Sequence, residues 1–133
     1  MNWNRVIGGG IAAGIVLWLA GFVMHAVILG KTYERYTEAF TQTEANPLHF
    51  LAISVAIGLF ASILFGKTRS SWAEGAKGGM AFGFFLGLAH FFTTFYNPLV
   101  IEGFPYYLSW CWGGIAVIER VLAGAVLGLI VKR

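Results

Sequence analysis

Three long stretches of this chain contain no charged residue. They are 25, 22 and 24 residues long, and they run from Val6 to Gly30, from Ala45 to Gly66 and from Gly78 to Ile101. A helix needs about 20 apolar residues to cross the roughly 30 Å hydrocarbon core of a bilayer. Each stretch is therefore long enough for one membrane-spanning helix, and none has the alternating pattern of a β-barrel strand.

A fourth stretch is apolar but contains two charges. An uncharged run ends at Ile118, Glu119 and Arg120 follow, and 11 further uncharged residues reach Val131. Eleven residues are too few to cross a bilayer, and the apolar character is the same on both sides of the charges. We therefore predict one helix over residues 107–131. The alternative is a re-entrant segment followed by an interfacial helix.

The composition supports a chain surrounded by lipid. Apolar residues make up 58% of the sequence before glycine is counted, and charged residues make up 11%. Globular domains average about 45–50% apolar residues with glycine included, and about 25% charged residues. The expected fold is an all-α membrane protein, a single integral domain over residues 1–133 that forms a bundle of four transmembrane helices, at about 6–29, 47–66, 72–96 and 107–131.

Local signals help to place the helix ends. Asn46-Pro47 is typical of an N-cap followed by proline in the first turn, and Ser71 with Glu74 resembles a capping box. The latter predicts that the third helix starts near residue 72. Between the first two helices, residues 32–43 place Tyr33 and Tyr36 on one helical face, which predicts a helix lying at the interface. An ordinary polar loop is the alternative.

Basic residues predict the orientation. Six of the eight basic residues that flank the expected spans lie on one side of a four-span path: Arg5, Lys67, Arg69, Lys77, Lys132 and Arg133. Short loops rich in Lys and Arg face the cytoplasm, so both termini are expected there. This asymmetry accounts for the net charge of +3. No basic stripe with interleaved aromatic residues indicates binding to nucleic acid.

Glycines recur at four-residue spacing in three of the expected helices. Such faces let helices approach closely, which drives association in lipid. We expect them to pack helices within the bundle; a dimerisation face is the alternative. The glycines are Gly10 and Gly14, Gly79, Gly83 and Gly87, and Gly124 and Gly128.

The first and third helices share a further pattern. Each opens with Gly-Gly-x-x-x-Gly, at Gly9 and at Gly78, and each later carries a histidine, His25 or His90. A duplicated two-helix hairpin would produce this arrangement.

Two segments resemble known membrane proteins. The opening Gly8-Gly-Gly-Ile-Ala-Ala-Gly that leads to His25, and the closing Val121-Leu-Ala-Gly-Ala-Val-Leu-Gly, are similar to small uncharacterised four-helix bacterial inner-membrane proteins. The resemblance covers the first and last helices. It implies a bacterial source, an inner-membrane location and four spans, and it carries no activity with it.

Ionisable residues inside the spans are the best functional candidates, because each costs free energy in lipid and tends to face the bundle interior. Glu119 and Arg120 lie near the membrane midplane by helix rise. Adjacent helix positions point about 100° apart, so we expect each of the two residues to need a partner on another helix. The pair either fixes helix register or forms a proton relay or an anion-binding site.

The three histidines share the outer half of the membrane. A structural role for each is one interpretation, because lone membrane histidines commonly hydrogen-bond a neighbouring helix. Gly21 and Gly87 leave volume beside His25 and His90, which leaves haem between these two as an alternative. A metal site from His25, His49 and His90 has suitable ligand types but no spacing signature, and a quinone is a further alternative.

We predict a polar pocket that opens outward, where His25, His90 and Glu119 converge. Phe91, Tyr96, Tyr107 and Trp110 are its expected walls, and Arg120 completes the candidate ligand-binding residues.

No motif of a soluble enzyme is present, and enzyme activity is left undecided. The leading interpretation is a non-catalytic inner-membrane protein without a cofactor that serves as an accessory or assembly subunit of other membrane chains, or that assembles with itself. The alternative is a membrane-embedded redox, metal- or quinone-binding or small transport protein that uses the His, Glu and Arg residues.

Overall fold

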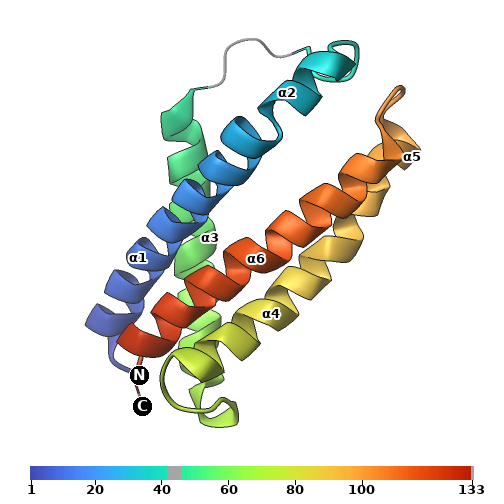
Figure 1. The fold of residues 1–133 in the computed structure, drawn as a ribbon. Helices are drawn as coiled ribbons and strands as arrows, with labels where there is room; N and C mark the ends of the chain where they lie inside the picture. The colour runs from blue at the N-terminus through green and yellow to red at the C-terminus, as the bar shows by residue number, and fades with distance from the viewer. Residues whose placement is uncertain (42–45, 133) are drawn as a thin grey trace.

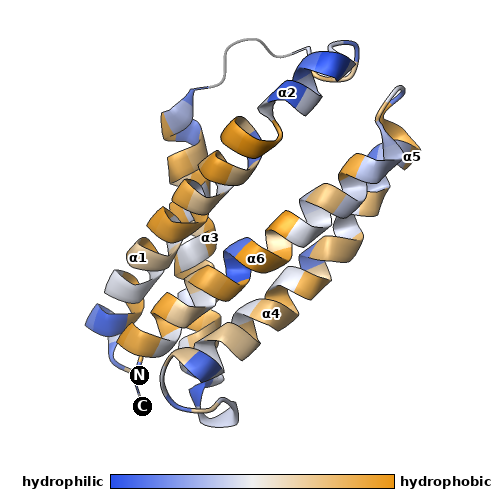
Figure 2. Ribbon diagram, viewed as in Figure 1, coloured by the Kyte–Doolittle hydropathy of each residue, from blue (hydrophilic) through white to orange (hydrophobic). Residues whose placement is uncertain are grey.

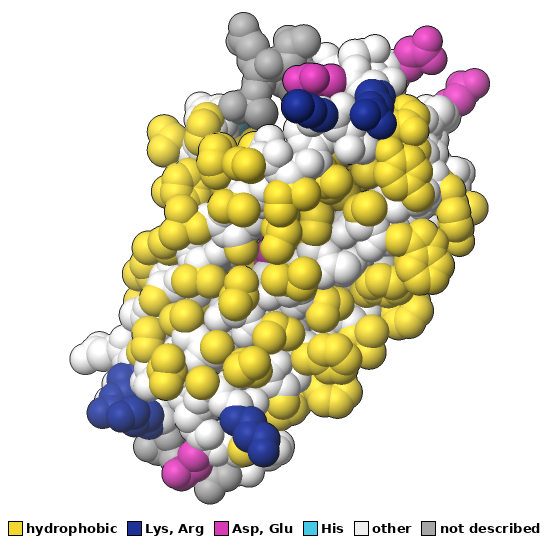
Figure 3. Space-filling model, viewed as in Figure 1, with side chains coloured by type: hydrophobic (Ala, Val, Ile, Leu, Met, Phe, Trp, Pro, Cys, Tyr) yellow, Lys and Arg dark blue, Asp and Glu magenta, His cyan; other side chains and the backbone are white. Residues whose placement is uncertain are grey.

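The computed structural model describes residues 1–41 and 46–132, and its regular elements are helices. Four of them are long and apolar enough to span a membrane: Trp3–Ile28, Pro47–Lys67, Gly75–Val100 and Tyr106–Ile130. An apolar belt covers the middle of the face seen in Figure 3, and charged side chains gather at the two ends. The predicted all-α architecture with four potential spans is confirmed, including one helix through Glu119 and Arg120.

The first span changes its winding partway along. Helix α1 (Trp3–Gly21) continues directly into a π-helix, η1 (Phe22–Ile28). Two short pieces follow, α2 (Gly30–Tyr33) and the 3₁₀ turn η2 (Glu34–Tyr36). Instead of an interfacial helix over residues 32–43, helical structure ends at Tyr36, and residues 42 and 43 lie outside the described residues.

The second span is α3 (Pro47–Lys67). Its start is as predicted, because the Asn46 side chain accepts a hydrogen bond from the Leu48 amide and Pro47 occupies the first turn. A 3₁₀ turn, η3 (Arg69–Ser71), follows α3.

The third span begins three residues later than predicted. Helix α4 (Gly75–Thr93) follows extended backbone at Trp72, and Gly75 takes a positive φ of 68° that suits glycine. The capping box of Ser71 and Glu74 does not form. Instead, the Arg69 guanidinium binds the carbonyls of Trp72 and Ala73, which keeps this segment out of the helix.

The last two spans are joined by a short turn. Helix α4 continues through a 3₁₀ turn, η4 (Thr94–Tyr96), into α5 (Asn97–Val100), and the fourth span is α6 (Tyr106–Ile130). Between them Gly103 has a φ of 75°. Hydroxyl groups tie η4 to α6, because Thr94 Oγ1 donates to the Ser109 carbonyl and Ser109 Oγ donates to the Thr94 carbonyl.

The spans pack as two pairs. Helix α1 lies along α3 and α4 lies along α6, while α1 and α6 join the pairs. Figure 1 shows this arrangement, with both termini at the same end of the bundle. We call this end the termini end and the opposite end the pocket end. Figure 2 shows hydrophilic residues at both ends and a hydrophilic break midway along α6.

Backbone contacts at glycine hold each pair together. A Cβ at Gly10 would lie 2.8 Å from Leu59 Cα of α3, and a Cβ at Gly87 would lie 2.6 Å from Val117 Cα of α6. Gly14 also meets α3, and Gly79, Gly83, Gly124 and Gly128 meet backbone across the α4–α6 contact. The four-spaced glycines therefore lie between helices of the same chain.

Side chains fill the centre of the termini end. The buried core joins all four spans and consists of Val6, Ala13, Leu17, Phe65, Phe82, Ala123, Leu127 and Val131. Within it, the rings of Phe65 and Phe82 lie 5.1 Å apart. A buried hydrogen bond of 2.6 Å from Ser62 Oγ to the Val6 carbonyl adds a polar tie between α3 and α1.

Candidate functional site

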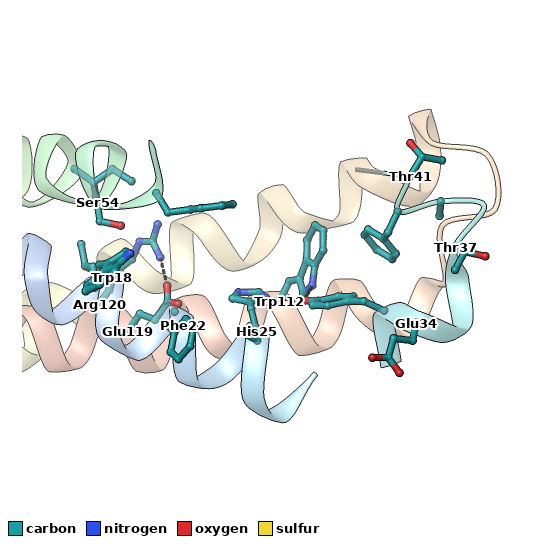
Figure 4. A pocket seen from close by; sticks show the side chains of 18 residues that line it. Trp18, Phe22, His25, Glu34, Thr37, Thr41, Ser54, Trp112, Glu119 and Arg120 are labelled. Carbon is teal, nitrogen blue, oxygen red and sulfur yellow. Dashed lines mark hydrogen bonds and ion pairs between the residues drawn. The ribbon is translucent and has the colours of Figure 1, made fainter. Parts of the chain in front are cut away.

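A cavity of about 900 Å³ occupies the pocket end. It lies between α1 with η1, α3 and α6, and α2, η2 and the residues after them line it as well. Helix α4 does not contribute to it. The lining side chains are mostly apolar and aromatic, with Glu119, Arg120 and His25 among the polar exceptions. Figure 4 shows Glu119 and Arg120 toward one end of the cavity, His25 in its middle, and Glu34 and Thr37 toward the other end.

Glu119 and Arg120 pair with each other. Their nearest side-chain atoms, Arg120 Nη1 and Glu119 Oε2, lie 3.7 Å apart, and the side chain of Arg120 is 14% exposed and that of Glu119 15% exposed. We expected each of the two residues to have a partner on another helix. Among the described residues, neither side chain makes a hydrogen bond or an ion pair with another helix. The long arginine side chain instead folds back along its own helix, where Nη1 donates to the Ala116 carbonyl at 3.2 Å.

This ion pair leaves much of its hydrogen-bonding capacity unused. A separation of 3.7 Å is longer than a hydrogen bond, and a guanidinium has five N–H donors. Among residues 1–41 and 46–132, the Arg120 side chain donates one hydrogen bond, to the Ala116 carbonyl. The site therefore offers spare donors from Arg120 and spare acceptors from Glu119 to the cavity.

Gly21 sets how close α1 comes to Glu119. A Cβ at Gly21 would lie 3.0 Å from Glu119 Oε1. We predicted from the sequence that Gly21 leaves free volume beside the His25 ring. The Glu119 carboxyl group occupies part of the space beside Gly21. Glycine at this position lets the carboxylate of α6 sit against the backbone of the first span.

His25 belongs to a chain of hydrogen bonds at the outer side of the cavity. Its Nδ1 lies 2.6 Å from the Tyr33 hydroxyl, and Trp112 Nε1 donates to the same hydroxyl at 2.8 Å. The chain joins η1, α2 and α6. Phe40 packs on both rings, 5.0 Å from Tyr33 and 6.0 Å from Trp112.

The donors in this chain can be assigned. Burial raises the pKa of Tyr33 to about 12, although the hydrogen bond from Trp112 opposes the rise, so its hydroxyl keeps its proton at neutral pH. Indole N–H only donates, so Tyr33 accepts from Trp112 and its own proton is free for His25 Nδ1. When Tyr33 donates to Nδ1, the His25 proton sits on Nε2, the ring nitrogen on the other side of the imidazole from Tyr33, and His25 lines the cavity.

The π-helix positions His25. Single-turn π-helical insertions are rare and occur often at functional sites. Here Phe22, His25 and Ala26 of η1 all line the cavity. Of these three residues, His25 packs its ring 6.0 Å from the ring of Trp112 of α6.

The structure does not bring His90 to this cavity. His90 is exposed on α4, and His49 is exposed at the start of α3. His25 and His90 therefore do not face each other across a space for haem. Among the described residues, no group of three His, Cys, Asp or Glu side chains is placed to hold a metal ion.

The expected aromatic walls also lie elsewhere. Tyr96 and Trp110 are 66% and 55% exposed, and neither lines the cavity. Trp110 instead packs on Phe91 and Phe95, with ring centroids 5.7 and 5.1 Å away. These rings form a separate cluster on the α4–α6 pair, whereas Tyr107 lies 6.1 Å from the ring of Tyr36. Of the predicted ligand-binding residues, the structure unites His25, Glu119 and Arg120.

Sequence reasoning missed several cavity residues. Trp18, Phe22, Tyr33 and Trp112 line the cavity, but nothing in their spacing distinguishes them from aromatic residues that face lipid. The available signal was the depth of Trp112 relative to His25. Both lie in the outer half of their helices, and this places them near one another once the two helices are known to pack.

Comparison with known protein families, with curated proteins and with solved structures finds no match to this chain.

Proposed function

We propose that this chain is a four-span protein of the bacterial cytoplasmic membrane that binds a small lipid-soluble molecule in the cavity between α1, α3 and α6. The observation that carries the proposal is the cavity of about 900 Å³ that encloses the Glu119–Arg120 pair. Ligand sites have volumes of roughly 300–1,000 Å³ and combine apolar walls with a few polar groups. Ionisable side chains inside a membrane tend to mark binding or transport paths.

The cavity favours ligand binding over a purely structural role. An accessory or assembly subunit, alone or as a homo-oligomer, needs complementary outer faces but no interior cavity with unused charges. Transport and redox roles both require a bound molecule, so each would use this site. Ligand binding is the common step, and it is the function that we propose.

Orientation forms part of the proposal. Both termini lie at the same end in Figure 1, and the segments at that end carry Arg5, Lys67, Arg69, Lys77 and Lys132. The positive-inside rule then places the termini in the cytoplasm and the cavity in the outer half of the membrane. Reporter fusions after residue 133 and within residues 33–44 should report opposite compartments, and matching compartments would contradict this orientation.

The binding proposal can be tested without knowing the ligand. The protein is extracted from membranes in mild detergent and analysed by native mass spectrometry. We expect a stoichiometric small-molecule adduct that is depleted in Trp112→Phe, which breaks the hydrogen bond to Tyr33, but is kept in Trp110→Phe. These tryptophans lie on the same helix, and only Trp112 lines the cavity. No adduct on the wild type, or equal adducts on both variants, would contradict the proposal.

A further inference from the structure

The charges in the cavity limit the ligand's own charge. A cationic ligand would be attracted by Glu119 but repelled by Arg120 within the same site. An anionic ligand would be attracted by Arg120 but repelled by Glu119. The two side chains lie 3.7 Å apart, so neither can act on a ligand without the other. Moving a net charge to this depth also carries a desolvation cost. The cavity therefore suits a neutral molecule.

Two donors are available on opposite sides of the same space. Arg120 has unused N–H groups beside the cavity. His25 carries its proton on Nε2, the ring nitrogen that does not contact Tyr33, when the Tyr33 hydroxyl donates to Nδ1. Figure 4 shows His25 between Glu119 and Trp112, so Nε2 faces the part of the cavity on the Glu119 side. A ligand that fills this part needs acceptors at two separated positions.

Aromatic rings make up much of the cavity wall. Trp18 and Phe22 come from the first span, Phe50 from α3 and Trp112 from α6. Aromatic rings pack well in offset-stacked or edge-to-face arrangements. A planar ring fits such walls better than a branched or flexible polar group does.

The cavity is open to lipid near its charged end. Glu119 lies within the span Tyr106–Ile130, and its side chain is 15% exposed. Gly21 has no side chain to cover the Glu119 carboxylate from α1. A lipid-soluble molecule can therefore reach the site from the bilayer.

We infer that the ligand is a quinone, a neutral planar ring whose two carbonyl oxygens accept hydrogen bonds from Arg120 and from His25 Nε2. The inference rests on the proposed binding function and specifies its ligand class. A single-hydroxyl amphiphile would satisfy one of the two donors, whereas the para carbonyls of a quinone satisfy both. The rest of the cavity accommodates the start of an apolar tail that leaves toward lipid.

The test uses the full chain in phosphatidylcholine nanodiscs. Decylubiquinone is titrated while tryptophan emission is recorded, and decylbenzene, which lacks carbonyls, serves as the matched compound. Palmitate and tetraphenylphosphonium represent anionic and cationic ligands, and each is tested as a competitor. We expect saturable quenching by decylubiquinone that decylbenzene, palmitate and tetraphenylphosphonium do not displace.

Variants separate site binding from partition into lipid. Arg120→Gln and His25→Phe should each weaken decylubiquinone binding about tenfold, the loss expected for one hydrogen bond with a strong donor. Trp110→Phe should leave the affinity unchanged. Circular dichroism and the thermal midpoint establish that each variant is folded, and Arg120→Lys, which keeps a donor, should recover part of the affinity.

The outcomes distinguish the two proposals. Displacement of a native adduct by palmitate or tetraphenylphosphonium, without saturable quinone binding, would overturn the quinone assignment and leave the ligand-binding function in place. Quinone quenching that is equal in the wild type, Arg120→Gln and His25→Phe would also overturn it. Absence of both a native adduct and any saturable ligand would overturn the ligand-binding function itself.

Discussion

Two arginines in this chain have different surroundings. At the termini end, Arg69 is 6% exposed and donates to three backbone carbonyls, those of Val131, Trp72 and Ala73, at 3.0–3.1 Å. Midway along α6, the Arg120 side chain donates to the Ala116 carbonyl and lies 3.7 Å from Glu119. The first guanidinium makes three hydrogen bonds to the backbone of other segments, whereas the second makes one within its own helix.

The same contrast holds for the two ends of the bundle. At the termini end, glycines bring backbones into contact and the side chains of the core fill the remaining space. At the pocket end, the α4–α6 pair stays tied by Thr94 and Ser109, but α1 and α3 leave a cavity against α6. The difference indicates that stability is concentrated at the termini end, so that the pocket end can keep a cavity whose polar groups have hydrogen-bonding capacity to spare.

The largest effect should come from filling a glycine contact at the termini end. A side chain at Gly79 would collide with the Gly124 carbonyl, which is backbone and cannot move aside. Gly79→Leu should destabilise the bundle by about 3 kcal/mol, at the upper end for overpacking. Unfolding in mixed micelles with increasing SDS measures this.

Gly114 provides the matched control. It lies on α6, and nothing stands within 4 Å of a Cβ at that position. Gly114→Leu should change stability by less than about 0.5 kcal/mol, as surface substitutions generally do. Equal effects of Gly79→Leu and Gly114→Leu would show that the α4–α6 contact is not formed as described.

The two arginines should separate stability from binding. Arg69→Gln should cost about 2–3 kcal/mol, because a charged donor to buried carbonyls is lost. Arg120→Gln should cost about 1 kcal/mol, because one intrahelical bond is lost. Ligand binding per folded molecule should fall in Arg120→Gln and should change less in Arg69→Gln. A larger stability loss for Arg120→Gln than for Arg69→Gln would make Arg120 a structural residue and contradict the comparison.

A smaller effect is expected where α1 meets Glu119. In Gly21→Ala the new Cβ would lie 3.0 Å from Glu119 Oε1, so the carboxylate must shift by a few tenths of an ångström. Stability should change by about 0.5 kcal/mol, while retention of the native adduct in mass spectra should fall. Gly8→Ala, on the same helix with nothing within 4 Å, should alter neither. Unchanged adduct retention in Gly21→Ala would place the ligand away from Glu119.

The smallest effect is spectroscopic and concerns Tyr33. Burial raises the pKa of this phenol to about 12 from an ordinary value of 10. The stability that the neutral phenol contributes is therefore complete below pH 10 and is lost as the pH rises toward 12. The difference in phenolate absorbance between the wild type and Tyr33→Phe should appear near pH 12. A difference that titrates near pH 10 would mean that Tyr33 is not held between His25 and Trp112.

The spans and their glycine faces could be predicted because both depend on local composition. The uncharged runs that begin at Val6 and at Gly78 are long enough to cross a bilayer. Small residues at four-residue spacing form one face of a helix. The start at Gly75 could not be predicted, since Arg69 binds the Trp72 and Ala73 carbonyls. A tertiary contact there overrides the local capping signal.

The candidate site was predictable only in part. Counting residues gives depth in the membrane, which placed His25 and His90 at similar levels, but it does not give the direction that each side chain faces. His90 faces outward from α4, whereas the π-helix turns His25 toward α6. No proline or charge marks the start of the π-helix at Phe22. The partnership of Glu119 with Arg120 also depended on the side chain folding back to Ala116.

The most direct test of the central claim, that the pocket end is a ligand site and the termini end is structural, is photolabelling. A decyl-chain quinone that carries a diazirine is irradiated with the protein in membranes, and labelled peptides are mapped by mass spectrometry. We expect labels on residues 17–26 and 112–120 that excess decylubiquinone removes. Labels spread over lipid-facing positions such as Phe60 and Leu99, and not removed by excess decylubiquinone, would contradict it.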